Sequence, residues 1–296
     1  MIGAHGPSRV GIVGLGLMGG SLALALARRG VAIVGADPDE AARAELGPRL
    51  AGGVLAPAPT DALGSCEVVV LAVPLGALAA AAEAVRPCLG PDAVVTDLTS
   101  LKAAPLALLA KCLPEARLVG SHPMAGRERG GTTNADPDMF AARPWAIVRG
   151  ACADDEAVER VRALAHAVGA VCVDIGADAH DRTVAALSHL PYLLSGALAR
   201  AASRLAEAGA VDGALAGPGL EGMLRLSAQP AWMDAVSAEN AANVRGALDA
   251  LEVELAAARA ALEEAADGGG TALVALGEAG RLARARLLGR RSRDGA

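Results

Sequence analysis

Short apolar runs alternate with Ala- and Leu-rich stretches of helical character over the first 175 residues, and this alternation restricts the fold more than any other feature. The apolar runs predict strands at 9–13, 31–36, 67–73, 93–97, 117–121, 145–149 and 170–175. The stretches between them predict helices near 18–29, 38–46, 75–86, 102–112 and 154–168. Near-continuous apolar strands separated by helices favour a parallel sheet that is covered on both faces. We therefore expect an α/β N-terminal region with a doubly wound parallel sheet.

Beyond residue 175 the strand-like runs stop and the pattern becomes helical. The expected helices cover about 178–208, 218–228, 230–265 and 271–290. This change predicts a Rossmann-type dinucleotide-binding domain at 1–176 and an all-helical substrate and dimerisation domain at 177–296, with the boundary near Gly176. Long Ala-rich helices with apolar stripes have more surface than one small domain can bury. We therefore expect a homodimer formed through the helical half.

Composition excludes several classes of function. The chain is 53% hydrophobic and 20% charged, which is typical of a globular protein, and its net charge of −6 argues against nucleic acid or anionic membrane as a partner. Five cysteines without CxxC or metal-like spacing favour a reducing compartment and no metal site. No signal-peptide pattern opens the chain, and its longer apolar runs are interrupted by Pro, Arg or His. A soluble cytoplasmic protein is the expectation.

A glycine-rich turn between the first strand and the first helix points to a dinucleotide. It consists of Gly14, Leu15, Gly16, Leu17, Met18 and Gly19. A GxGxxG pattern alone is weak evidence, but here a strand precedes it and a helix follows. The first glycine permits the tight turn, the second lets a pyrophosphate approach the backbone, and the third lets helix and strand pack closely. The N-terminus of the helix then presents amide donors to the phosphates.

The second predicted strand ends at Asp37, whose carboxylate can accept hydrogen bonds from both ribose hydroxyls and would repel a 2′-phosphate. No Arg or Lys occupies 38–42, so NAD is favoured over NADP. Val73 and Pro74 end another strand, where they are expected to line the nicotinamide half of the cofactor. A plain buried strand end would explain these last two residues equally well.

A histidine bounded by Gly and Pro follows the strand at 117–121. The segment reads Leu118-Val-Gly-Ser-His-Pro-Met-Ala-Gly126 and places His122 in a loop at the strand end. A neutral imidazole there suits a general base, because its ordinary pKa lies near pH 7. A dinucleotide site and a proton acceptor together favour oxidation by hydride transfer.

Five segments carry a resemblance to a known family. They are GIVGLGLMGGSLA (11–23), VVTDLTSLK (94–102), GSHPMAGRERGG (120–131), LSHLPYLL (187–194) and GLEGMLRLSAQPAW (219–232). From about residue 9 to 262 the chain resembles the prephenate/arogenate dehydrogenase family of tyrosine biosynthesis. The resemblance implies NAD-dependent oxidative decarboxylation of prephenate to 4-hydroxyphenylpyruvate, with release of carbon dioxide.

The resemblance also assigns roles to individual residues. His122 matches the family's catalytic base. Ser100 matches a serine that hydrogen-bonds the same substrate hydroxyl, although a helix N-cap is an alternative role for it. The family glycine before this serine is Thr99 here, so the local backbone is in question. His180 and His166 fall outside the matched motifs and are expected to face solvent.

Five further residues match positions near the family's substrate pocket. Arg225 matches the arginine that binds a substrate carboxylate, a task that suits a planar guanidinium. The others are Glu128, His189, Tyr192 and Trp232, and for these a solvated ion pair or core packing is an alternative. The chain departs from the family pattern at Tyr192, where many members have histidine, and at Gly222 and Leu224, just before the arginine. These departures bear on the choice of substrate.

Several alternatives stay open at this point. Arogenate is the closest rival substrate, and a relative from specialised metabolism that acts on an amino-substituted prephenate is another. A β-hydroxyacid dehydrogenase would need a catalytic lysine in the helical half, yet no lysine follows Lys111. A non-catalytic dinucleotide sensor is the fourth alternative, and the combination of His122, Ser100 and Arg225 argues against it.

Overall fold

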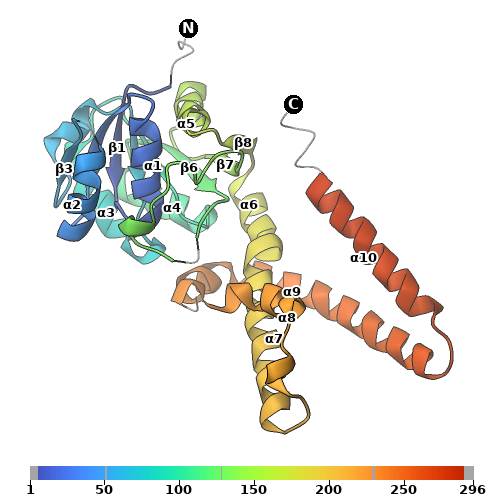
Figure 1. The fold of residues 1–296 in the computed structure, drawn as a ribbon. Helices are drawn as coiled ribbons and strands as arrows, with labels where there is room; N and C mark the ends of the chain where they lie inside the picture. The colour runs from blue at the N-terminus through green and yellow to red at the C-terminus, as the bar shows by residue number, and fades with distance from the viewer. Residues whose placement is uncertain (1–5, 51, 128, 229–230, 290–296) are drawn as a thin grey trace. The chain divides into compact units, whose positions relative to one another are not determined.

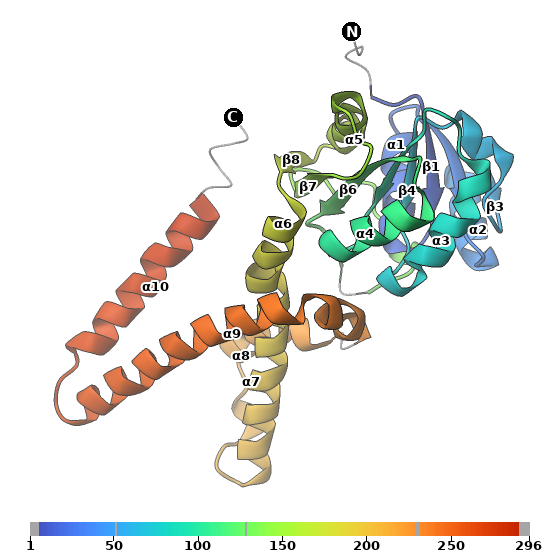
Figure 2. The same cartoon turned by 180° about the vertical axis from the view of Figure 1, so that it is seen from behind.

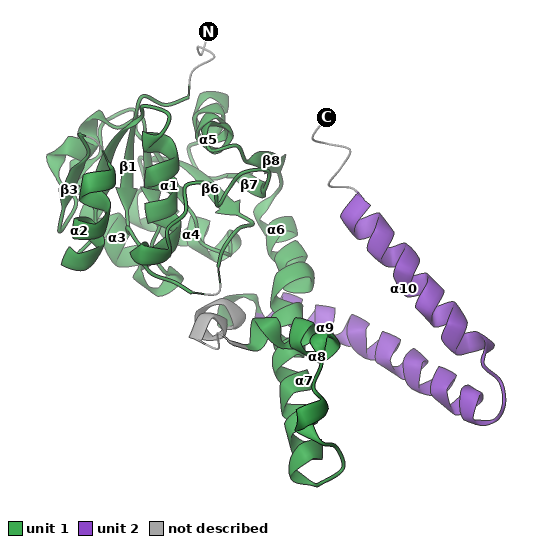
Figure 3. Cartoon of the chain, in the orientation of Figure 1, with its two compact units in different colours: residues 1–240 green, residues 241–296 purple. Residues whose placement is uncertain are grey.

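The computed structural model describes residues 6–289 apart from 51, 128 and 229–230, and it describes no side chains for 228–237. The chain divides into two compact units, residues 1–240 and 241–296 (Figure 3). The larger unit holds the sheet and the first helices of the C-terminal half (Figure 1). It is the unit that contains the candidate site.

One eight-stranded sheet forms the centre of the larger unit. Its strands are β1 (Arg9–Val13), β2 (Ala32–Ala36), β3 (Val54–Ala56), β4 (Val68–Leu71), β5 (Val94–Asp97), β6 (Arg117–Pro123), β7 (Pro144–Arg149) and β8 (Val171–Asp174). They lie in the order β3-β2-β1-β4-β5-β6-β7-β8. All pairs are parallel except β6 with β7. The predicted strands are thus confirmed, and the three-residue β3 is an additional edge strand.

Helices cover both faces of this sheet, as the sequence predicted. The helices are α1 (Leu17–Ala27), α2 (Glu40–Leu46), α3 (Leu78–Val85), α4 (Ala103–Cys112) and α5 (Asp155–Ala167). Successive residues of β4 point to opposite faces: Val68 and Val70 pack in one buried cluster with residues of α1 and α5, while Val69 and Leu71 pack in another with residues of α3 and α4. Figures 1 and 2 show these helices from the two sides.

The antiparallel pairing of β6 corrects one expectation about His122. Strand β6 pairs with β5 only through Arg117 and Leu118, but it continues along β7 as far as Pro123. His122 therefore lies within the strand, opposite Ala146, and not in a loop after it. The sheet is mainly parallel, as expected, and the reversed β7 supplies backbone partners beyond the point where β5 ends, which extends β6.

The C-terminal half is helical. It contains α6 (Ala177–Val184), a five-residue π-helical turn (Ala185–His189), α7 (Leu190–Glu207), α8 (Pro218–Leu224), α9 (Ala231–Ala266) and α10 (Thr271–Gly289). The sequence predicted one helix over 178–208. The structure interrupts this helix with the π turn just before Pro191, whose missing N–H cannot continue the regular ladder. Among the described residues, no helix combines the length and hydropathy needed to cross a membrane.

Candidate active site

The glycine-rich turn joins β1 to α1 in a conformation that needs glycine at two positions. Gly14 has a φ of +92°, and a Cβ there would lie 2.5 Å from the carbonyl oxygen of Ala72. A Cβ on Gly19 would lie 1.8 Å from the carbonyl oxygen of Gly14. Both distances are below any real contact, so the turn and the close approach of the helix depend on the missing side chains.

Gly16 differs from Gly14 and Gly19, because a Cβ there would meet no protein atom within 4 Å. It is the N-cap residue of α1, with the helix amides of Leu17 and Met18 directly after it. The protein itself therefore gives no steric reason for glycine at this position. Open space beside the first turn of a helix fits a bound pyrophosphate, whose charge is favoured there.

Replacing Gly16 with Ala should leave folding intact and weaken NAD binding by about tenfold or more, because the methyl group would occupy the space of the pyrophosphate. Isothermal titration with NAD and thermal unfolding test this. Gly47→Ala is the matched control, since Gly47 has ordinary helical angles and its added Cβ would meet only one atom, at 4.0 Å. Equal NAD affinity in all three proteins would argue against this turn as the cofactor site.

Asp37 directly follows β2 and lies beside the glycine turn, as the sequence predicted. Its carboxylate accepts hydrogen bonds from the backbone N–H of Leu15 at 2.6 Å and of Asp39 at 2.8 Å, which ties the strand end to the turn. Arg43, just beyond the segment that lacks basic residues, donates to the backbone carbonyl of Asp37 at 2.6 Å. Val73 also lies against the turn, 3.0 Å from the position of a Cβ on Gly14, while Pro74 is exposed.

His122 contacts a second histidine that the sequence did not single out. Its Nδ1 lies 2.9 Å from Nε2 of His180 on α6, and the two ring centroids are 5.1 Å apart at an interplanar angle of 70°. Nδ1 of His180 lies 2.8 Å from Oδ1 of Asp181. The expectation that His180 faces solvent is wrong, because only 2% of the residue is exposed. His166 on α5 is exposed, as expected.

Asp181 also caps the N-terminus of α4. Its two carboxylate oxygens accept the backbone N–H groups of Lys102 at 2.8 Å and of Ala103 at 2.9 Å. Burial opposes ionisation of Asp181, but hydrogen bonds from His180 and from these two amides outweigh it and hold the pKa below its ordinary value. The carboxylate therefore stays ionised at neutral pH, and it fixes α6 to the start of α4.

This cap corrects the alternative role that the sequence suggested for Ser100. The N-cap residue of α4 is Lys102, and its first amides are satisfied by Asp181 from another helix. Ser100 lies in the segment between β5 and α4, where it is half-buried. This segment follows the carboxyl end of β5, the edge at which doubly wound sheets bind their ligands.

Lys102 is a functional candidate that the sequence interpretation missed. Its side chain is completely buried, and its Nζ forms an ion pair with the equally buried Asp97. The same Nζ donates to the backbone carbonyl of Ser121 at 2.7 Å. Since Ser121 directly precedes His122, this contact joins the end of β5 to the part of β6 that carries the histidine.

Two histidines of this site, His122 and His189, are held in the neutral form. Burial lowers the pKa of His122 well below its ordinary value of 6.5, and the positive charge of Lys102 lowers it further. Burial likewise lowers the pKa of His189 to about 4. A neutral imidazole has one nitrogen free to accept a proton, which is the state a general base requires.

Three further predicted residues, His189, Tyr192 and Arg225, lie on helical segments of the same unit. His189 ends the π turn, is 1% exposed, and has its Nδ1 3.3 Å from Nδ2 of Asn240. Tyr192 lies on the first turn of α7 and is half-buried. Arg225 is exposed and begins a short helical turn that packs against α7. Glu128 and the side chain of Trp232 lie outside the described residues.

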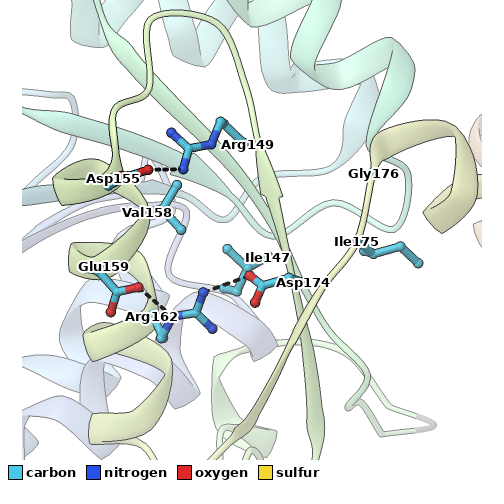
Figure 4. A pocket seen from close by; sticks show the side chains of 9 residues that line it. All are labelled: Ile147, Arg149, Asp155, Val158, Glu159, Arg162, Asp174, Ile175 and Gly176. Carbon is cyan, nitrogen blue, oxygen red and sulfur yellow. Dashed lines mark hydrogen bonds and ion pairs between the residues drawn. The ribbon is translucent and has the colours of Figure 1, made fainter.

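A hollow of about 680 Å³ lies elsewhere, against α5, β7 and β8 (Figure 4). Its lining includes Arg149, which pairs with Asp155, and Arg162, which pairs with Glu159 and Asp174. None of the predicted site residues lines it. Because both arginines in its wall are already paired with carboxylates of the same wall, we assign it no ligand.

Comparison with known proteins matches both halves of the chain. Residues 22–174 match the family model described as prephenate dehydrogenase, nucleotide-binding domain, and residues 176–274 match prephenate dehydrogenase, dimerization domain. NovF of Streptomyces niveus, named a probable prephenate dehydrogenase, is 32% identical over 266 residues, covering 88% of this chain and 70% of that protein. Prephenate dehydrogenase of Bacillus subtilis is 30% identical over 195 residues, and the match spans 63% of this chain and 52% of that protein.

Solved structures agree on the fold. The structure of prephenate dehydrogenase from A. aeolicus, in complex with hydroxyphenyl propionate and NAD+, aligns with a TM-score of 0.81 at 24% identity, over 95% of this chain and 99% of that one. Arogenate dehydrogenase from Synechocystis aligns with a TM-score of 0.77 at 25% identity, over 92% and 98%. On the two family models and the relative from Streptomyces, the chain belongs to the prephenate dehydrogenase family.

Proposed function

We propose that this protein is an NAD-dependent prephenate dehydrogenase, which converts prephenate to 4-hydroxyphenylpyruvate and carbon dioxide in tyrosine biosynthesis. The observation that carries the proposal is the histidine of the GSHPMAG segment. His122 lies near the carboxyl end of β6, its pKa is held well below 6.5 by burial, and its Nδ1 is bound to His180. A half-buried neutral base at the ligand-binding edge of a dinucleotide-binding sheet suits removal of a hydroxyl proton.

The proposed reaction balances without a net proton. The O–H bond of the 4-hydroxyl breaks and its proton goes to Nε2 of His122. The hydrogen on the ring carbon that bears this hydroxyl leaves as hydride. The bond to the ring carboxylate breaks, carbon dioxide departs, and the electron pair passes through the ring to the 4-oxygen. His122 then returns the proton to that oxygen, which becomes a phenol. Aromatisation of the ring makes the step effectively irreversible.

The glycine turn fits the cofactor that this reaction needs. Gly14, Gly16 and Gly19, with the amides at the start of α1, would hold the pyrophosphate, and Asp37 would accept the ribose hydroxyls. Val73 lies against the turn, and Pro74 is the next residue in the sequence. When bound, the nicotinamide supplies the hydride acceptor.

Substrate contacts are proposed from the matched motifs. Ser100, half-buried after the end of β5, would hydrogen-bond the 4-hydroxyl beside His122. His189 and Tyr192 would line the pocket from the junction of the π turn and α7. Glu128 and Trp232 complete the proposed set from their motif positions alone.

Arg225 is proposed to bind a substrate carboxylate. Arg225→Ala should raise the KM for prephenate about tenfold or more with a smaller change in kcat, because a bidentate guanidinium contact to a carboxylate is lost. Steady-state kinetics with varied prephenate test this. The matched control is Arg200→Ala, which removes an exposed arginine of α7. This variant should leave KM unchanged. An unchanged KM in the first variant would assign the carboxylate to a different residue.

The function is tested by following NADH formation with prephenate and arogenate in parallel, each with NAD and with NADP. The proposal expects the highest kcat/KM with prephenate and NAD. Arogenate is the second candidate substrate, because a structural neighbour of similar length is named arogenate dehydrogenase. An amino-substituted prephenate is a third substrate to assay, since Tyr192, Gly222 and Leu224 depart from the family pattern. No NADH formation with any of the three would refute the assignment.

We further propose that the active form is a homodimer in the cytoplasm. The helical half matches the family's dimerization domain, and α9 and α10 carry exposed apolar side chains, among them Val253 (68% exposed), Val274 (74%) and Leu287 (60%). Apolar surface of this kind favours association with a second copy. The reducing cytoplasm suits the five cysteines, which are free thiols.

A further inference from the structure

A chain of three side chains leads from the proposed base into the interior of the larger unit. His122 Nδ1 lies 2.9 Å from His180 Nε2, and His180 Nδ1 lies 2.8 Å from Asp181 Oδ1. His122 comes from β6 and the other two residues come from α6, so the chain joins the sheet to the first helix of the C-terminal half. His180 is 2% exposed and Asp181 is 5% exposed.

The ionised carboxylate determines where each proton in this chain lies. A carboxylate only accepts hydrogen bonds, so the nitrogen facing Asp181, Nδ1 of His180, carries a proton. When His180 carries only this proton, its Nε2 is an acceptor and Nδ1 of His122 donates to it. The neutral His122 is left with its lone pair on Nε2, the remaining ring nitrogen. Asp181 therefore selects, through His180, the nitrogen of His122 that can act as the base.

We propose that His180 and Asp181 form a proton relay behind His122: they orient it as the Nδ1–H tautomer and take up the proton that it removes from the substrate. This inference rests on the proposed function. His122 accepts the hydroxyl proton at Nε2 and passes its Nδ1 proton to Nε2 of His180. The imidazolium of His180 then lies against the carboxylate of Asp181. The two transfers reverse when the proton returns to the phenolic oxygen, so no proton is gained or lost.

The charges around the two rings favour this route. The positive charge of Lys102 lowers the pKa of His122, so it makes a second positive charge on His122 unfavourable. Among the described residues, the negative charge in hydrogen-bond contact with this pair of histidines is the carboxylate of Asp181, which contacts His180. Its remaining contacts, the amides of Lys102 and Ala103, keep it fixed and ionised. A proton on His180 is thus closer to negative charge than a proton on His122.

Two substitutions at His180 separate orientation from proton transfer. His180→Phe keeps an aromatic ring but removes the acceptor, whereas His180→Gln offers a carbonyl oxygen that can still accept from Nδ1 of His122. Neither side chain takes up a proton. The relay predicts that both variants lose about tenfold or more in kcat, with a similar KM for prephenate, and that glutamine does not restore the rate. His166→Gln, at an exposed position on α5, is the control and should retain the wild-type rate.

The outcomes of this comparison are distinct. Wild-type kcat in His180→Gln with a loss only in His180→Phe would overturn the relay and leave His180 as a positioning residue. Wild-type kcat in both variants would overturn the inference altogether. Thermal unfolding of each variant, together with its NAD affinity, separates a loss of chemistry from a loss of structure.

The tautomers can also be measured without any activity. The chain has five histidines, so long-range ¹H–¹⁵N spectra of the imidazole side chains can be assigned with single His→Gln variants. The relay predicts that His122 and His180 are both Nδ1–H tautomers near pH 7.5, and that Asp181→Asn disturbs this state in His180. An Nε2–H tautomer in either ring would overturn the relay even if the enzyme oxidises prephenate. Conversely, if both rings are the expected tautomers but no NADH forms, the proposed function is refuted and the predicted tautomers stand.

Discussion

His122→Asn should lower kcat by a factor on the order of 100 or more while leaving the fold and NAD affinity close to those of the wild type. The amide cannot accept a proton from the substrate hydroxyl at neutral pH, so general-base catalysis is lost. Its N–H can still donate to Nε2 of His180, which preserves the contact between β6 and α6. Single-turnover formation of NADH measures the chemical step, and thermal unfolding with NAD titration verifies the structure. Retained turnover would exclude His122 as the base.

The pH profile gives a second measure of the same role. His122 must be neutral to act, and burial holds its pKa well below 6.5. The neutral form therefore persists as the pH falls through 6.5, and kcat/KM should begin to decline only at lower pH. An acid limb centred at or above 6.5 would show that a histidine with an ordinary pKa, or another group, controls the rate. In His122→Asn this limb should be absent from the residual activity.

Much of the fold follows from local pattern. The apolar runs of β1, β4 and β5 are buried on both sides, so composition alone marks them as central strands. The three-residue β3 carries too short a pattern to be recognised. The reversed direction of β7 depends on how the chain returns after β6, and a strand has the same side-chain period in either direction. Local sequence therefore predicted its existence but not its orientation.

The candidate site was predictable to the extent that its residues lie in one segment. The glycine turn and Asp37 lie within a single strand–helix–strand unit, and the structure joins them through the Leu15 amide. By contrast, His122 meets a histidine 58 positions away, and Asp181 meets the amide of Lys102 79 positions away. Such pairs leave no local periodicity. Adjacent His and Asp on a polar helix resemble a solvated face until α4 and β6 are packed against them.

Lys102 did leave a signal in the sequence. The chain has 27 basic residues, and Lys102 and Lys111 are its two lysines. An arginine fork would not fit where the Lys102 ammonium lies, with Asp97 on one side and the Ser121 carbonyl on the other. One of the two lysines thus lies where a compact cation is bound, whereas the other, Lys111, is exposed on α4.

Lys102→Met should destabilise the folded protein by about 3–5 kcal/mol, because it leaves the buried carboxylate of Asp97 without its counter-charge. Asp97 is 0% exposed, and its Oδ1 already has no hydrogen-bond partner among the described residues. Urea unfolding at constant pH measures the free energy of unfolding. Lys111→Met is the matched control, since Lys111 is exposed on the last turn of α4 and should change this free energy by less than about 0.5 kcal/mol.

The double variant Lys102→Met with Asp97→Asn separates the cost of an unpaired charge from the role of the lysine at the site. Removing both charges should restore much of the lost stability, while an amide oxygen can still accept from the Thr99 N–H, now 2.9 Å from Asp97 Oδ2. Turnover should not recover with it, because the Nζ contact to the Ser121 carbonyl, which holds the backbone beside His122, is still missing. If stability and kcat return together, Lys102 acts on the fold alone. If the double variant is no more stable than Lys102→Met, the unpaired carboxylate is not the source of the loss.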